Sequence, residues 1–169
     1  MAHIIGQLLD IAELDALVVG STEKADLQSV AAEVAEFVAP LALAQGKDIA
    51  LSGASEPVWV KGNPEMLGRA IRNLAENAIN HTAAGSTVEF VVDESGTVSV
   101  LDRGPGISED ERKLIFRRFW RRDRRKQGST GLGLSIVQRI AELHSAVITV
   151  ENREPNGARF SLKFVSIKP

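Results

Sequence analysis

The chain has 169 residues, of which 44% are hydrophobic and 25% charged, a composition that suits one compact domain able to bury a core. Its 20 basic and 22 acidic residues give a net charge of −2, so no overall positive field indicates nucleic-acid binding, and the lack of cysteine excludes disulfides and thiolate chemistry. The histidines His3, His81 and His144 lack metal-ligand spacing, and no apolar run approaches the roughly 20 residues of a membrane-spanning helix. We therefore expect a soluble chain without a membrane segment.

The N-terminal segment is predicted to be a helix from Ile4 to Val19. Ile4, Leu8 and Ile11 lie on one apolar stripe, and the acidic residues fall mostly off it. Gly20-Ser21-Thr22 then breaks the pattern, which places a domain boundary near residue 22. The segment reads as the helical tail of something larger, and its stripe is expected to favour self-association as a homodimer.

A second helix is predicted to begin after Asp26, a residue suited to an N-cap, and to end at Gly46 with a kink at Pro40. Residues 49–51 and 58–60 follow as two short apolar strands, joined by a turn rich in Gly, Ser and Pro.

The next helix begins at Asn63-Pro64 and carries three amides on one edge of its apolar stripe: Asn73, Asn77 and Asn80. Asparagine is a poor helix former, so three asparagines along one edge of a helix indicate a function for their side chains. We call this edge the amide ridge. A neutral amide oxygen can join the ligands of Mg²⁺ without adding negative charge near phosphates, which favours Asn77 as a metal ligand. The alternative is that these amides bond to the backbone of a neighbouring strand.

Residues 87–92 and 97–101 are predicted to form a hairpin that ends at Asp102. The turn Gly104-Pro105-Gly106 follows, and its glycines allow another group to approach the backbone closely. A carboxylate at this place can accept a hydrogen bond from the exocyclic amine of adenine. Alternatively, Asp102 only initiates the turn.

Ser108 and Glu111 form a capping box for a short helix through Ile115. Residues 117–131 lack apolar periodicity and are dense in arginine, which predicts a loop. Such a run is often a solvated face or a nucleic-acid patch. Its position favours a mobile lid that neutralises a triphosphate, with a root anchored by the aromatic residues Phe116, Phe119 and Trp120.

The stretch from Gly128 to Gly133 runs from this loop into the start of a helix predicted over residues 132–144. Free N–H groups at a helix N-terminus favour phosphate, although a flexible linker would show the same composition. The stretch is not a Walker loop, because the G-K-[ST] ending is absent. Strands over residues 147–150 and 160–165 close the chain.

The four clusters N-L-A-E-N (73–77), D-R-G-P-G (102–106), F-R-R-F-W (116–120) and G-S-T-G-L-G-L (128–134) occur in an order that is hard to obtain by chance. They resemble the asparagine, first glycine, phenylalanine and second glycine boxes of the catalytic and ATP-binding domain of bacterial sensor histidine kinases. That ATPase superfamily is shared with gyrase B and the mismatch-repair ATPases. The resemblance covers residues 23–169, while residues 1–22 resemble the end of the dimerisation and phosphoacceptor hairpin.

The resemblance implies a two-layer α/β sandwich of the Bergerat type, with a mixed sheet covered by helices on one face. It implies that Asn77 binds Mg²⁺, that Asn73 helps to organise metal or water, and that Asp102 binds the adenine amine. The remaining nucleotide-binding residues that it implies are Asn80, His81, Gly104, Gly106, Arg121, Gly128, Thr130, Gly131, Leu132 and Gly133.

The implied activity is transfer of the ATP γ-phosphoryl group to a histidine within a two-component system, with a response regulator downstream. The family's acceptor histidine lies in a preceding hairpin, and His3 does not match that context, so the acceptor is expected on another segment or chain. Asn80 stands where the family commonly has lysine. The resemblance implies a cytoplasmic domain and allows a parent anchored in the inner membrane. Two alternatives remain: a stand-alone serine kinase of the anti-sigma type, and a nucleotide-binding interaction module without turnover.

Overall fold

The computed structural model describes residues 23–123 and 130–168, together with residues 5, 6, 8, 9, 12 and 15. Those six N-terminal residues are helical, as predicted. The rest of the predicted N-terminal helix, the boundary near residue 22, and Gly128 lie outside the described residues.

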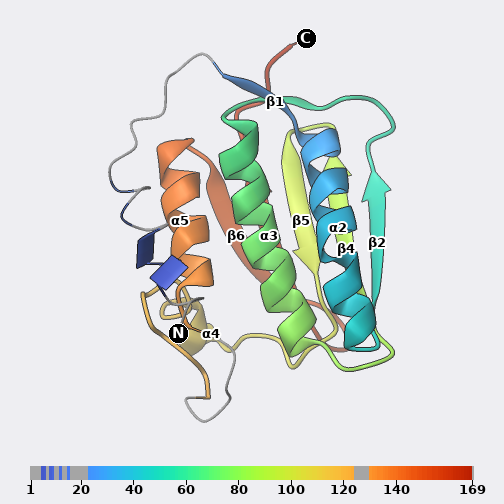
Figure 1. Cartoon of the computed structure of the whole chain (residues 1–169), viewed down its shortest axis with the longest axis vertical. Coiled ribbons are helices and arrows are strands. Elements are labelled where there is room, and N and C mark those ends of the chain that lie inside the picture. The colour runs from blue at the N-terminus through green and yellow to red at the C-terminus, as the bar shows by residue number, and fades with distance from the viewer. Residues whose placement is uncertain are drawn as a thin grey trace.

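The main sheet has five strands in the order β2-β4-β5-β7-β6. β2 pairs with β4 in parallel, and the other neighbours are antiparallel, so the sheet is mixed. Figure 1 shows helices α2, α3 and α5 side by side over one face of this sheet, which confirms the predicted two-layer sandwich. The strands are β2 (Asp48–Gly53), β4 (Thr87–Asp93), β5 (Thr97–Leu101), β6 (Val147–Asn152) and β7 (Ala158–Lys163).

Three helices begin at the caps that the sequence predicts. The side chain of Asp26 accepts from the N–H of Gln28, and that of Asn63 accepts from Met66, so each satisfies a donor of the first turn. Ser108 and Glu111 form the reciprocal capping box. The helices are α2 (Leu27–Ala44), α3 (Pro64–His81), α4 (Glu109–Arg112) and α5 (Gly133–Leu143).

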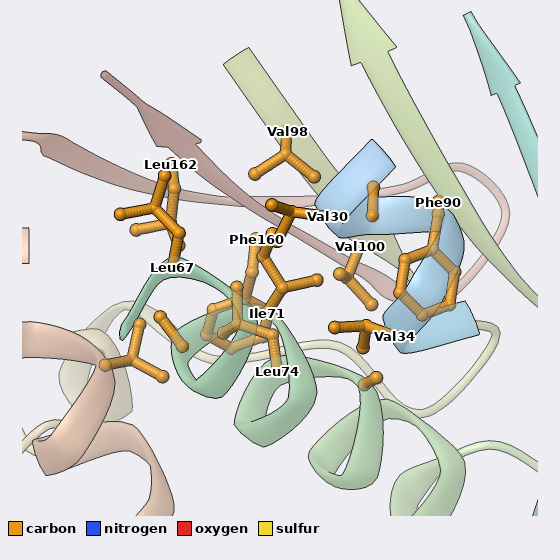
Figure 2. Close-up of a cluster of buried hydrophobic side chains, with 14 of the residues drawn as sticks. Val30, Val34, Leu67, Ile71, Leu74, Phe90, Val98, Val100, Phe160 and Leu162 are labelled. Atoms are coloured by element: carbon orange, nitrogen blue, oxygen red, sulfur yellow. The ribbon is translucent and has the colours of Figure 1, made fainter. Parts of the chain in front are cut away.

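The core lies between the helices and the sheet. Figure 2 shows Leu67 of α3 near Leu162 and Ile71 of α3 near Phe160, while Phe90 lies on the side of Val34 of α2. Burying each such side chain contributes roughly 1.5–3 kcal/mol. Helix α2 is long and apolar enough to cross a bilayer, but core helices pass that test too, and the buried face of α2 packs on α3 and the sheet.

The two strands predicted around residues 50 and 59 form, but they do not belong to one sheet. β2 is an edge strand of the main sheet, whereas β3 (Trp59–Lys61) pairs antiparallel with β1 (Lys24–Asp26), which was not predicted. A strand of three residues is too short to show a period of two. The last strand begins at Ala158 rather than residue 160, because its pairing with Asn152 extends the ladder.

His144 joins α3 and α5 at one end of the sandwich. Its buried ring lies with Nδ1 2.7 Å from the carbonyl oxygen of Ile140, and its Nε2 accepts from the N–H of Asn63 at 3.2 Å. This pattern requires a neutral ring with the proton on Nδ1. The prediction that His144 ends a helix is confirmed, and the ring also ties that end to the cap of α3.

Ser145 follows α5 in the left-handed region, with φ of 52°. A side chain costs about 1 kcal/mol there, a cost that glycine avoids. We expect Ser145→Gly to raise the free energy of unfolding, measured by denaturant titration, by roughly 0.5–1 kcal/mol. Ser145→Ala keeps the Cβ atom and is the matched control. An equal gain from both variants would refute backbone strain as the cause.

Candidate functional site

A cavity of about 710 Å³ opens at the end of the sandwich where α3 ends and α5 begins. Figure 1 shows β5 ending and α4 lying at this same end. The cavity gathers residues from all four sequence clusters. The predicted site residues that line it are Asn73, Asn77, Asn80, His81, Asp102, Gly106, Arg121, Thr130, Gly131 and Gly133.

Two predicted site residues lie behind the cavity wall. The backbone N–H of Gly104 donates to Asp102 Oδ1 at 2.8 Å, so Gly104 helps to hold the Asp102 carboxylate in place. Leu132 is fully buried and belongs to the hydrophobic core. Both therefore shape the wall without lining the cavity.

Asp102 presents one carboxylate oxygen to the cavity. The residue is buried, and its Oδ1 accepts from the N–H groups of Gly104 and Ala158, at 2.8 and 3.1 Å. Among the described residues, no donor contacts Oδ2. A carboxylate oxygen can only accept, so this wall is suited to a ligand that carries an N–H donor.

The turn between β6 and β7 fixes Asp102 from the other side. Gly157 has φ of +112°, and a Cβ atom there would lie 2.1 Å from the carbonyl oxygen of Asp102. Only glycine permits so close an approach. Arg153 adds a hydrogen bond from Nη1 to the same carbonyl at 3.2 Å. The backbone carbonyl of Asp102 is thus in contact with both Gly157 and Arg153.

The asparagine side chains of α3 differ in their hydrogen bonds. Asn73 donates from Nδ2 to the carbonyl of Arg69 at 2.9 Å, and its Oδ1 lies 3.1 Å from the place where Gly133 would carry a Cβ atom. Asn77 lines the cavity, and its side chain makes no hydrogen bond to any described residue. Within the described part of the chain, neither amide bonds to a neighbouring strand, so the alternative reading of the ridge is not seen. The amide of Asn77 is available to a ligand.

The N-terminus of α5 faces the same cavity without a side-chain cap. Thr130, Gly131 and Gly133 line the cavity directly before and at the first turn. The first N–H groups of a helix have no partner within the helix and carry the positive end of its dipole. This wall is suited to an anion.

Two consecutive arginines of the arginine-rich segment line the cavity, and they differ in their hydrogen bonds. Arg121 lines the cavity, and its buried Nε has no acceptor among the described residues. Arg122 is engaged: Nε and Nη2 contact Glu111 at 2.5 and 2.9 Å, and Nη2 donates to the carbonyl of Gly106 at 2.7 Å. Residues 124–129 of the proposed lid lie outside the described residues.

The aromatic root of the lid is only partly as predicted. Phe116 and Trp120 pack against the core, whereas Phe119 is 59% exposed and does not anchor the root. Its backbone has φ of 64°, and its N–H donates to the carbonyl of Gly131 at 2.9 Å. The backbone of Phe119 therefore joins the two ends of the loop, while its ring is exposed to solvent.

Lys47, Gln45 and Thr82 also line the cavity and were not predicted. The buried Lys47 donates to the carbonyl of Ile79 and, at 3.0 Å, to Gln45 Oε1, so it covers the C-terminal end of α3. No sequence signal marks a single lysine in a turn. Thr82 accepts from the N–H of Arg103 at 3.1 Å and joins α3 to the turn after Asp102.

The hydrogen bonds from Arg122, and after them those from Ser108, lower the pKa of Glu111 from 4.5 to about 2. A lowered pKa means that the carboxylate stabilises the folded state above pH 4.5, and that this effect is lost as the pH falls toward 2. We expect the difference in free energy of unfolding between the parent and Glu111→Gln to be larger at about pH 6 than at about pH 3, with the size reduced by solvent screening. A difference independent of pH in urea titrations would contradict the ion pair.

Comparison with known proteins decides the family. The profile of the histidine kinase-, DNA gyrase B- and HSP90-like ATPases matches residues 62–167. The chain belongs to this ATPase family.

Individual relatives within the family are sensor histidine kinases. The chain is 36% identical over 143 residues to the sensor histidine kinase RppB of Synechocystis, covering 81% of this chain and 32% of that protein. It is also 36% identical over 131 residues to the sensor histidine kinase CpxA of Escherichia coli K12, covering 75% and 29%. The chain thus spans about a third of the length of these relatives.

Solved structures agree with this assignment. The chain superimposes on full-length ShkA in complex with AMPPNP with a TM-score of 0.79 and 28% identity, covering 99% of this chain and 36% of ShkA. It superimposes on the catalytic domain of the histidine kinase ThkA with a TM-score of 0.75 and 26% identity, covering 85% and 94%. The chain is therefore a catalytic, ATP-binding domain of the sensor histidine kinase type.

Proposed function

We propose that this domain holds ATP with Mg²⁺ in the cavity and transfers the γ-phosphoryl group to a histidine on a helical hairpin domain. One observation carries the proposal. A single cavity brings together Asp102, whose Oδ2 has no donor among the described residues, the amide of Asn77 and the uncapped N-terminus of α5. Asp102 matches the amine of a base, Asn77 matches a cation bound to phosphates, and the N-terminus of α5 matches the anionic phosphates.

The adenine end of the site is Asp102. Its Oδ2 would accept a hydrogen bond from the exocyclic amine, while the two backbone donors on Oδ1 keep the carboxylate in place. Thr82 and Ala158 complete the wall around it. A carbonyl group at the same position of the base would meet an acceptor and be rejected.

The donor set at the other end fits Mg²⁺. Magnesium keeps several waters and takes its remaining ligands from one or two protein oxygens and from phosphates. Asn77 offers such an oxygen, and the Oδ1 of Asn73 lies close by at the start of α5. When bound, the ion would neutralise charge on the phosphates. Thr130, Gly131 and Gly133 would receive the phosphates at the helix N-terminus.

The chain's contribution to transfer is positioning. A nitrogen of the acceptor imidazole would attack the γ-phosphorus in line, and the bond to the bridging oxygen would break with its electron pair leaving on ADP. The guanidinium of Arg121, whose Nε has no acceptor among the described residues, would donate to the phosphate oxygens. We place the domain on the cytoplasmic side of its parent, with a response regulator taking the phosphoryl group next.

The test is incubation with γ-labelled ATP, with and without a purified histidine-containing hairpin domain. We expect ATP binding by the chain alone and acid-labile label only on the added hairpin, because positioning supplies most of the catalysis. Acid-stable label on an anti-anti-sigma protein would favour the serine kinase. Tight ATP binding without transfer to any acceptor would favour the interaction module.

A further inference from the structure

Arg122 joins three segments at the mouth of the cavity. It lies on the segment that leads into residues 124–129, and its guanidinium contacts Glu111 of α4 and the carbonyl oxygen of Gly106. Both Arg122 and Gly106 line the cavity, and α4 lies at the same end of the sandwich (Figure 1). The contact therefore ties the segment that carries Arg122 to α4 and to the turn at Gly106, at the edge of the cavity.

Glu111 is well fixed for this contact. Its Oε2 accepts from the N–H and the hydroxyl of Ser108, both at 2.9 Å, so the capping box helps to orient the carboxylate toward Arg122. Surface ion pairs usually contribute little. A bidentate pair on a fixed carboxylate, extended by a third bond to Gly106, is the exception.

The two consecutive arginines therefore differ in role. The Nε of Arg121 lacks a partner among the described residues, whereas the guanidinium of Arg122 is paired with protein acceptors. A guanidinium already paired with a carboxylate is a poor phosphate ligand, since the pair must first be broken.

We propose that Arg122 and Glu111 are positioning residues that fasten the cavity mouth and thereby set how long a nucleotide stays bound. The proposal rests on the proposed function only in requiring that a nucleotide occupies the cavity. Opening the mouth would break three hydrogen bonds, so the pair slows release while leaving the phosphate contacts unchanged.

The turn that accepts a hydrogen bond from Arg122 has further contacts of its own. Asn152 of β6 holds the next residue from the other side, accepting from the N–H of Ile107 at 2.8 Å and donating to its carbonyl at 3.0 Å. Neither Arg122 nor Glu111 belongs to the buried core. Variants at both positions should therefore fold.

The experiment is stopped-flow release of fluorescent ATP and ADP analogues from the 169-residue chain in Mg²⁺. Glu111→Gln keeps a side chain that can serve the capping box and removes the ion pair. Arg122→Gln removes the other partner. We expect each variant to release both analogues roughly 5–10-fold faster, and the double variant to release them no faster than either single one.

Glu142→Gln is the matched control, because Glu142 also pairs with an arginine, Arg139, but does not line the cavity. Its release rates should equal those of the parent. Unchanged rates in Glu111→Gln and Arg122→Gln would overturn the proposal. Slower ATP release from Glu111→Gln would also overturn it, since Arg122 would then be a phosphate ligand that Glu111 restrains. Failure of the parent chain to bind either analogue would refute the proposed function and the inference with it.

Discussion

Asn77→Ala is expected to lower the rate of phosphoryl transfer to an added hairpin by about 100-fold or more at saturating ATP. The substitution removes the amide oxygen best placed to hold Mg²⁺ on the phosphates. It should leave the fold intact, because the Asn77 side chain bonds to no described residue and alanine is a better helix former. The measurement is the transfer rate across a magnesium titration.

Asn77→Asp is the matched control for this prediction. It keeps an oxygen ligand and adds a negative charge beside the phosphates, so it should recover part of the lost rate at raised magnesium. If Asn77→Ala retained the magnesium dependence of the parent, the ligand assignment would be wrong. Circular dichroism of both variants would confirm that α3 is intact.

Asp102→Asn is expected to reverse the preference for the base. The asparagine Oδ1 can still accept from the N–H groups of Gly104 and Ala158, which places the new amide NH₂ where Oδ2 faced the cavity. An NH₂ donor repels the adenine amine and suits a carbonyl. We expect ATP affinity to fall by about 1–3 kcal/mol and ITP affinity to rise. Calorimetric titration with both nucleotides measures this.

Asp102→Ala, the simpler substitution, would mix two effects. It removes the ligand contact, but it also leaves two buried backbone donors without an acceptor, each at a cost of about 1–3 kcal/mol to stability. Lower affinity in that variant would therefore not separate base recognition from local unfolding. An Asp102→Asn variant that binds ATP as the parent does would remove Asp102 from base recognition.

Local signals made most of the framework predictable from the sequence. The caps Asp26 and Asn63 and the capping box at Ser108 act within one turn, and the hairpin of β4 and β5 is closed by a short turn. The resemblance of the four clusters then predicted the wall residues that the cavity brings together. Each of these features depends on residues close in sequence.

Contacts between distant segments could not be predicted in this way. The parallel pairing of β2 with β4 and the small sheet of β1 and β3 join segments separated by other elements. Lys47 reaches the end of α3 across 32 positions, and Arg122 meets Glu111 and Gly106 only because the chain turns back at α4. A basic run gives no indication of which arginine has a protein acceptor.

The hydrogen bond from Asn63 to His144 holds the N-terminal end of α3, and Asn77 lies far from that end along the helix. Asn77 is 14 positions beyond Asn63, about 21 Å along the axis at about 1.5 Å per residue. A tilt of about 1° at the bonded end would thus displace Asn77 by roughly 0.4 Å, close to the ~0.5 Å tolerance of a well-organised site. The hydrogen bond from Asn63 to His144 therefore helps to set the direction of the helix that carries Asn77.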